Sequence, residues 1–299
     1  MSNSQANRIR WLSGFPPHTW LGVFILIVSE ISLIFGLRVV IEWFTPIMWT
    51  GYILIMDGWL RKQSGESWLT NRAKEFPLLV LASVGIWVLF EAYNLHLQNW
   101  YYLSLPRSEI LKTVGYFWSF ATIIPGVFLT SQIVEQYFPA QRDQAKADQI
   151  NGEPHLLFLV GLAMVILPLA VPRSIARYLF GSVWIGFILL VDPINESIEA
   201  PSLRAMLGNG RYQRIFALLI GGFICGLLWE AWNFQAFLRG GGHWIYTVPD
   251  ALRILDLHYG QMPMLGMLGF PPFALELYAM YHFLRKMLGG ERLFGPSFW

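Results

Sequence analysis

The stretch WTGYILIMD at positions 49–57 decides the fold, because it recurs 135 residues later as WIGFILLVD at positions 184–192. Both stretches begin with tryptophan, carry glycine at the third position and end on aspartate. Hydrophobicity explains why two apolar runs look alike, but it does not explain a shared glycine and a shared aspartate. The match therefore predicts an internal duplication of the chain.

Further matches continue in the same order along the two halves of the sequence. Glu91-Ala92-Tyr93-Asn94 corresponds to Glu230-Ala231-Trp232-Asn233, Trp100 and Tyr102 correspond to Trp244 and Tyr246, and Pro125 corresponds to Pro271. The collinear order predicts two tandem repeats, one over residues 19–138 and one over residues 154–288, joined by a cytoplasmic linker over residues 139–153.

The composition indicates that lipid surrounds most of this chain. Of its 299 residues 55% are hydrophobic and only 13% are charged, which is far from the soluble norm. Long apolar runs, the first over roughly 20–43, can each cross the hydrocarbon of a bilayer alone or as closely linked pairs. A backbone in lipid must satisfy its own hydrogen bonds, and these runs are too long for barrel strands. The sequence predicts an all-α polytopic membrane protein with about eight transmembrane helices in two parallel four-helix repeats.

Charge and cysteine content limit the partners and the cofactors. Most Lys and Arg residues fall on the side that carries both termini, so both termini are expected in the cytoplasm and the protein in the cell membrane. A net charge of +2 without a basic block argues against nucleic acid as a partner. The one cysteine, Cys225, allows no intrachain disulfide, and the histidines lack ligand spacing, so neither a metal nor another cofactor is expected.

Each half offers a glutamate followed three residues later by an asparagine, Glu91 with Asn94 and Glu230 with Asn233. This spacing sets both side chains on one face of a helix. An ionisable group in lipid is costly, so it should face the interior of the bundle and is a functional candidate. The alternative is a hydrogen-bonded clasp between helices in which the glutamate is protonated.

Two further glutamates have no acidic counterpart in the other half. Glu30 corresponds to Val165 and Glu276 to Thr130, and broken symmetry often marks the specialised half of a duplicated protein. Glu30, Glu230 and Glu276 could therefore gather in one pocket. The alternative for each of them is a pairing with a neighbouring helix.

Prolines and aspartates complete the matched positions. Pro125 and the pair Pro271-Pro272 should interrupt helices near mid-membrane, where broken helices often mark a binding site, although Pro125 alone fits a packing kink. Asp57 and Asp192 are expected at the cytoplasmic ends of their helices with a structural role. The spacing of Asp57 and Arg61 is that of an ordinary ion pair within a helix.

The order of these motifs resembles the integral-membrane lycopene cyclase family of carotenoid biosynthesis. The matching residues are Trp229-Glu230, Trp244-Ile245-Tyr246 and Pro271 in the second half, with Glu91, Trp100-Tyr101-Tyr102 and Pro125 in the first. The resemblance implies an isomerase or cyclase that acts on an apolar isoprenoid. The chain departs from the family in two respects. The family's Pro-x-Glu-Glu motif is absent here, where Glu276 is the acid nearest to Pro271, and its repeats are usually read as three helices.

Three hypotheses follow from the sequence. The first is a membrane enzyme that protonates an isoprenoid or other lipid by carboxylic acid catalysis, with Glu230 as the acid, Glu276 or Glu91 as the base and Asn233 orienting. Asn94, Trp244, Tyr246 and Glu30 are then candidate substrate-binding residues. The second is a transporter or channel with a site between the repeats. The third is a non-catalytic subunit of a membrane complex that binds membrane lipid or pigment and partner helices. The chain has no Walker or Rossmann motif, so a nucleotide-driven pump is not expected.

Overall fold

The computed structural model describes residues 14–139, 153–252 and 257–297. The predicted linker 139–153 lies almost entirely outside the described residues, as do Arg8, Arg10, Arg142, Lys146 and Arg253, which contributed to the predicted orientation. Within the described part the chain is mostly helical. Its first half consists of α2 (Pro17–Ile34), α3 (Arg38–Glu42), α4 (Phe44–Ser64), α5 (Phe76–Leu97), β1 (Trp100–Leu103), α6 (Glu109–Ala121) and α7 (Ile123–Glu135).

The second half has a similar order of elements, but it adds a short helix before its longest helix and a hairpin after its first strand. It consists of α8 (Pro154–Ala170), α9 (Arg173–Ala176), α10 (Phe180–Ser197), α11 (Leu203–Gly208), α12 (Tyr212–Arg239), β2 (His243–Tyr246), the 3-10 turn η1 (Asp250–Leu252), β3 (His258–Tyr259), β4 (Met262–Pro263), α13 (Met264–Met267), α14 (Phe270–Met287) and α15 (Gly290–Phe294). The hairpin β3–β4 stands between β2 and α13, where the first half has only the short connection from β1 to α6.

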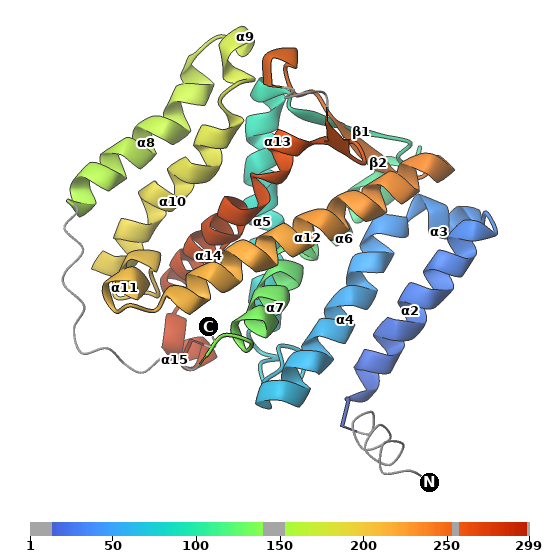
Figure 1. Cartoon of the computed structure of the whole chain (residues 1–299), viewed down its shortest axis with the longest axis horizontal. Helices are drawn as coiled ribbons and strands as arrows, with labels where there is room; N and C mark the ends of the chain where they lie inside the picture. Colours follow the sequence, from blue (N-terminus) through green and yellow to red (C-terminus); the bar gives the residue numbers. More distant parts are fainter. Residues whose placement is uncertain (1–13, 140–152, 253–256, 298–299) are drawn as a thin grey trace.

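The helices form a central group flanked by one pair on each side (Figure 1). In the centre α7 packs against α12, α12 against α14, and α5 against both α7 and α14. The pair α2–α4 lies on one side and the pair α8–α10 on the opposite side, so α2 and α8 are peripheral. Because α7 of the first half packs on α12, and α14 of the second half packs on α5, the halves interlock.

Proline and glycine set several helix boundaries. Pro17, Pro77, Pro154 and Pro271 stand in the first turns of α2, α5, α8 and α14, where the missing N–H group has no helical partner to lose. Helix α4 ends at Gly65, which adopts the left-handed conformation that stops a helix. Helix α2 ends at Ile34, because Gly36 takes a φ of 76°. The apolar run expected to continue to residue 43 is therefore split between α2 and α3, and Glu30 lies in the last turns of α2.

Asp57 and Asp192 each anchor the loop that follows their helix. Asp57 Oδ1 accepts a hydrogen bond from the backbone N–H of Trp68 at 2.7 Å, and Asp192 Oδ1 accepts one from Leu203 at 2.6 Å. In both cases the donor lies eleven residues after the acceptor. The partner expected for Asp57 was Arg61, but the carboxylate instead accepts from Ser67 and meets His18, because the chain folds back over the end of α4.

Two strands from different halves form a ribbon at the opposite end of the bundle. β1 pairs with β2 in antiparallel register, with Trp100 opposite Tyr246 and Tyr102 opposite Trp244. The ribbon crosses above the central helices in Figure 1 and brings together the two Trp-x-Tyr segments that the sequence matched. A prediction of helices alone did not include this element.

Four apolar helical segments are long enough to cross a membrane among the residues that the structure describes. They are Pro17–Ile34, Phe76–Leu97, Glu109–Glu135 and Tyr212–Arg239, and Pro154–Ala170 is a shorter apolar helix. The predicted membrane association of a helical chain is therefore supported. The number of eight spans and their grouping in two repeats go beyond this finding.

Candidate functional site

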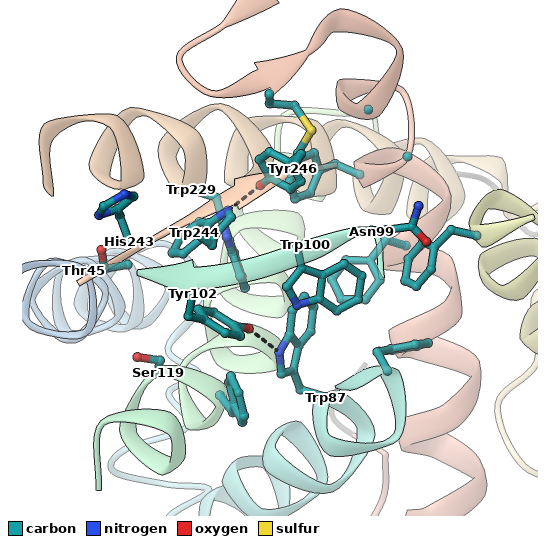
Figure 2. Close-up of a pocket in the computed structure, with 18 of the residues that line it drawn as sticks. Thr45, Trp87, Asn99, Trp100, Tyr102, Ser119, Trp229, His243, Trp244 and Tyr246 are labelled. Carbon is teal, nitrogen blue, oxygen red and sulfur yellow. Dashed lines mark hydrogen bonds between the residues drawn. The ribbon is translucent and has the colours of Figure 1, made fainter. Parts of the chain in front are cut away.

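A cavity of about 540 Å³ lies between the ribbon and the central helices, and both halves of the chain line it. Its wall consists mainly of aromatic rings, many of which Figure 2 shows around the ribbon. Trp87 and Trp229, from α5 and α12, lie in the middle with ring centroids 5.5 Å apart. Both rings also contact the ribbon, Trp87 through Trp100 and Trp229 through Trp244. We call this space the aromatic cavity; its other rings include Trp43, Trp49, Phe90, Tyr102, Tyr116, Phe180, Trp184, Tyr246, Phe270 and Phe273.

Glu91 stands behind this aromatic wall. Its Oε1 accepts hydrogen bonds from the indole N–H groups of Trp87 at 2.9 Å and Trp100 at 3.0 Å. The same oxygen accepts from the hydroxyl of Tyr102 at 2.5 Å. All three donors line the aromatic cavity, whereas Glu91 itself does not. The carboxyl group therefore reaches the cavity only through the side chains that it holds.

Glu230 occupies the matching place in the second half and is fully buried. Its carboxyl group faces the hydroxyl of Tyr246, which lines the aromatic cavity. The indole N–H of Trp244 donates to the same hydroxyl at 2.5 Å (Figure 2). Each half therefore sets one phenol hydroxyl in the cavity wall against one glutamate.

The hairpin β3–β4 is tied to Glu230. The backbone N–H of Gln261 donates to Glu230 Oε1 at 2.5 Å. Gly260 has a φ of 60°, and a Cβ atom at this position would lie 2.6 Å from the same oxygen. Only glycine combines this backbone conformation with so close an approach. Since Met262 of the hairpin lines the aromatic cavity, Glu230 connects the hairpin to the cavity wall.

Asn94 and Asn233 each hold the start of one ribbon strand, and Asn233 also contacts Glu230. Asn94 accepts hydrogen bonds from the backbone N–H groups of Asn99 and Trp100, and its amide donates to the carbonyl of Trp100 at 2.8 Å. Asn233 accepts from the N–H of Trp244 and donates to its carbonyl, both at 2.9 Å. Asn233 also donates to Glu230 at 3.4 Å, as the helical spacing suggested. The two asparagines thus fix the start of the Trp-x-Tyr segment in each strand.

The structure does not bring Glu30, Glu230 and Glu276 together. Glu30 is within hydrogen-bond distance of the side-chain amide of Gln235. Glu276 is fully buried in α14, and neither of its carboxyl oxygens has a hydrogen-bond partner among the described residues. None of the three lines the aromatic cavity. Of the predicted site residues, only Trp244 and Tyr246 contribute directly to its wall.

Burial keeps the two wall phenols protonated. Desolvation raises the pKa of Tyr102 well above its ordinary value, and the Glu91 carboxylate raises it further. The pKa of Tyr246 is raised by the same two causes, burial first and then the carboxylate of Glu230. Both hydroxyl groups therefore remain hydrogen-bond donors at neutral pH.

Both helix interruptions expected at proline occur, and one of them lines the aromatic cavity. Helix α6 ends at Ala121 and α7 begins at Ile123, two residues before Pro125. The short helix α13 ends at Met267, and α14 begins at Phe270 with Pro271 in its first turn. Leu268 and Gly269, which lie between these two helices, line the cavity. The break before α14 therefore opens space beside Phe270 and Phe273.

Sequence reasoning missed the charged and polar residues of the cavity wall, which are Glu42, Thr45, Asn99, Lys112, Ser119, Arg177 and His243. Of these, Thr45, Asn99 and His243 are at least nine-tenths buried. Asn99 and His243 carry a signal that could have found them, because each immediately precedes a Trp-x-Tyr segment. Thr45 has no such signal.

Neither metal clusters nor relatives identify the chain further. In the described ranges no three His, Cys, Asp or Glu side chains lie close enough to hold a metal ion. Comparison with protein-family models, with curated proteins and with solved structures finds no match. The fold and the site define a helical protein suited to a membrane, with an aromatic cavity between its two halves.

Proposed function

We propose that this protein is a membrane enzyme that binds an apolar isoprenoid polyene in the aromatic cavity and isomerises or cyclises it by acid catalysis. One observation carries the proposal. On each half a phenol hydroxyl of the cavity wall faces a glutamate: Tyr102 donates a hydrogen bond to Glu91, and Tyr246 lies against Glu230. A wall of ring faces with two such pairs suits a ligand that is apolar but becomes charged during reaction.

The chemistry needs one proton to enter the ligand and one to leave. Protonation of a carbon–carbon double bond forms a carbocation, which ring faces such as those of Trp87 and Trp229 stabilise through cation–π interaction. Loss of a proton from a neighbouring carbon restores a double bond. The product is an isomer of the substrate, so the reaction consumes no oxidant or reductant.

The geometry suggests which groups move the protons. Glu230 does not line the aromatic cavity, so in this scheme the protonated acid of Glu230 turns its O–H toward Tyr246 and passes the proton to the phenol oxygen, while the phenol proton passes to the ligand. Tyr102 and Glu91 would accept the departing proton by the reverse exchange. Asn94 and Asn233 are positioning residues in this scheme, because they hold the strands that carry the two phenols.

The proposed enzyme crosses the cell membrane eight times in two tandem four-helix repeats, with both termini in the cytoplasm. The matched order of elements supports the duplication, and so do the equivalent hydrogen bonds of Asp57 with Trp68 and of Asp192 with Leu203. The distribution of Lys and Arg supports the orientation.

The test uses the full chain in lipid nanodiscs with an acyclic polyene as substrate and chromatography of the products. Glu230→Gln and Tyr246→Phe should each lower turnover by about 10²-fold or more, the usual size of a lost acid catalyst. Quenching of tryptophan fluorescence by the polyene should persist in both variants, because the ring wall is intact. Glu291→Gln is the matched control, since Glu291 is exposed in α15 and does not line the aromatic cavity.

Turnover that survives in both variants would reject the assigned roles. Polyene binding without turnover in the unmodified protein would instead favour a non-catalytic pigment- or lipid-binding subunit, and copurifying chains would then be sought. Flux of a small substrate in liposomes, with no chemical change, would favour a transporter.

A further inference from the structure

Four buried polar atoms in the wall of the aromatic cavity have no hydrogen-bond partner within the described part of the chain. They are Thr45 Oγ1, Trp49 Nε1, Asn99 Oδ1 and His243 Nε2. The exposed fractions of these residues are only 6%, 3%, 9% and 5%. Buried polar groups in proteins are nearly always paired. Atoms of this kind on the wall of one cavity therefore point to polar groups on the molecule that the cavity receives.

These atoms lie at opposite ends of the ribbon. Asn99 immediately precedes β1, and its carbonyl accepts a hydrogen bond from the N–H of Thr247, just beyond the end of β2. His243 begins β2 and lies opposite Leu103, the last residue of β1. Asn99 and Leu103 are four residues apart, which is about 13 Å along a strand. Figure 2 shows Thr45 and His243 at one end of the ribbon and Asn99 at the other.

The end marked by His243 is closed by a tight approach of two segments. A Cβ atom on Gly241 would collide with the carbonyl of Ile41, so only glycine permits β2 to begin against α3. This contact brings His243 beside the start of α4, where Thr45 lies. Trp49 is one helical turn further along α4, on the same face as Thr45. The histidine, the threonine hydroxyl and the indole N–H therefore serve the same end of the cavity.

Each end of the ribbon presents an acceptor without a partner among the described residues, and the end marked by His243 also presents the Trp49 indole N–H, which can only donate. His243 Nδ1 lies 2.8 Å from the carbonyl of Gly241 and must donate to it, so Nε2 of the neutral ring carries a lone pair. The amide of Asn99 donates to the carbonyl of Arg177 at 2.9 Å, which fixes the orientation of the side chain and leaves Oδ1 as the free acceptor. A hydroxyl group can donate to either atom.

We infer that the aromatic cavity takes an elongated apolar molecule with a hydroxyl group at each end, such as a linear isoprenoid oxygenated at both ends. This inference rests on the proposed function in that it names the substrate class of the same site. Rings along the cavity contact the hydrocarbon. His243 with Thr45 binds one hydroxyl, and Asn99 binds the other.

The test measures equilibrium binding of labelled dodecanediol with one hydroxyl at each end, dodecanol and dodecane to the full chain in nanodiscs. Each affinity is corrected for partition of the probe into protein-free nanodiscs. The diol should bind roughly tenfold more tightly than the alcohol, and the alcohol roughly tenfold more tightly than the alkane, about one hydrogen bond for each step.

Variants then assign the ends. Thr45→Val together with His243→Phe should remove the tenfold gain in affinity that one hydroxyl group provides. Asn99→Leu should remove the gain that the other provides. With all three changes the diol should bind no more tightly than the alkane. Thr19→Val is the matched control, because Thr19 is equally buried with a hydroxyl that lacks a partner among the described residues, but it does not line the cavity. The control should bind all three probes as the unmodified protein does.

Equal corrected affinities for the three probes would overturn the inference while leaving an apolar site and the proposed enzyme intact. Selectivity for the diol that no cavity variant reduces would also overturn it. Binding of none of the probes would reject both the inference and the proposed function. Selectivity with the predicted variant effects, but without polyene turnover, would support the inference and reject acid catalysis.

Discussion

The two glutamates of the paired motifs differ in what holds them, although their sequence surroundings match. Glu91 is held by the side chains of Trp87, Trp100 and Tyr102, and it is only partly buried. Glu230 is fully buried and accepts from the backbone of the hairpin β3–β4 as well as from side chains. The first half thus uses its carboxyl group to fix rings, while the second half also uses it to fix a loop.

The residue one turn before each glutamate explains part of this difference. Trp87 precedes Glu91 by four residues, whereas Gly226 precedes Glu230 by four. The ring of Phe270, from the start of α14, lies where a side chain on Gly226 would stand. At this position the second half therefore has no indole, and the first turn of α14 packs against α12 instead. Two helices with matching sequence motifs thus keep similar anchor points, while the packing beside them differs.

The largest loss in the free energy of unfolding is expected when one of the two loop-anchoring aspartates is replaced. Asp57→Ala leaves the donors of Ser67 and Trp68 without an acceptor and removes the partner of His18, so we expect a loss of about 4 kcal/mol in the free energy of unfolding. Asp192→Ala removes only the acceptor of two backbone N–H groups, and about 3 kcal/mol is expected.

Unfolding of the aspartate variants is followed in mixed micelles of a mild and a denaturing detergent. Glu109→Ala, on an exposed helix surface, serves as the control. If Asp57→Ala proved no less stable than this control, the anchoring role described for the aspartates would be wrong.

A second comparison concerns the asparagines that hold the strands. Asn94→Ala removes the partner of two N–H groups and one carbonyl, for which we expect about 3 kcal/mol of destabilisation. Asn233→Ala removes one N–H and one carbonyl partner on Trp244, and about 2 kcal/mol is expected. The same unfolding titration measures both, and near-ultraviolet circular dichroism should report loosened tryptophans. Unchanged spectra in both variants would contradict the assigned clamping role.

The smallest expected effect tests the packing difference between the halves. Gly226→Ala places a methyl group against Phe270 and should cost about 1–2 kcal/mol, the lower part of the usual range for overpacking. Gly85→Ala is the matched control, since Gly85 is also within a membrane-type helix but has open space around the added atom. The control should be neutral or stabilising. Equal stability of the two variants would show that α14 has room to shift away from α12.

Matched sequence positions predicted local roles better than they predicted the site. Asp57 and Asp192 were expected to be structural, and each anchors a loop. Glu91 and Glu230 were expected to face the interior, and both lie behind the wall of the aromatic cavity. These features depend on contacts within one half, where neighbours in sequence are also neighbours in space.

The ribbon and the polar ends of the cavity depend on contacts between the halves, which periodicity does not report. Trp100 pairs with Tyr246, which lies in the other half of the chain, and two strands of four residues give too short an alternation to stand out among aromatic residues. The interpretation that Glu30 and Glu276 share a pocket with Glu230 rested on broken symmetry alone. Their different surroundings follow from the packing of α2 and α14, which the sequence does not specify.

The antiparallel ribbon has a consequence for the proposed duplication of the chain. Each half contributes one strand, so a free half would leave the backbone N–H and C=O groups of an edge strand without partners. A precursor consisting of a single half would have needed a second copy of itself to pair its strand and complete the ribbon. Two identical strands related by a two-fold axis pair in antiparallel fashion, so gene fusion of a homodimer would preserve the ribbon and free each strand to diverge at its ends.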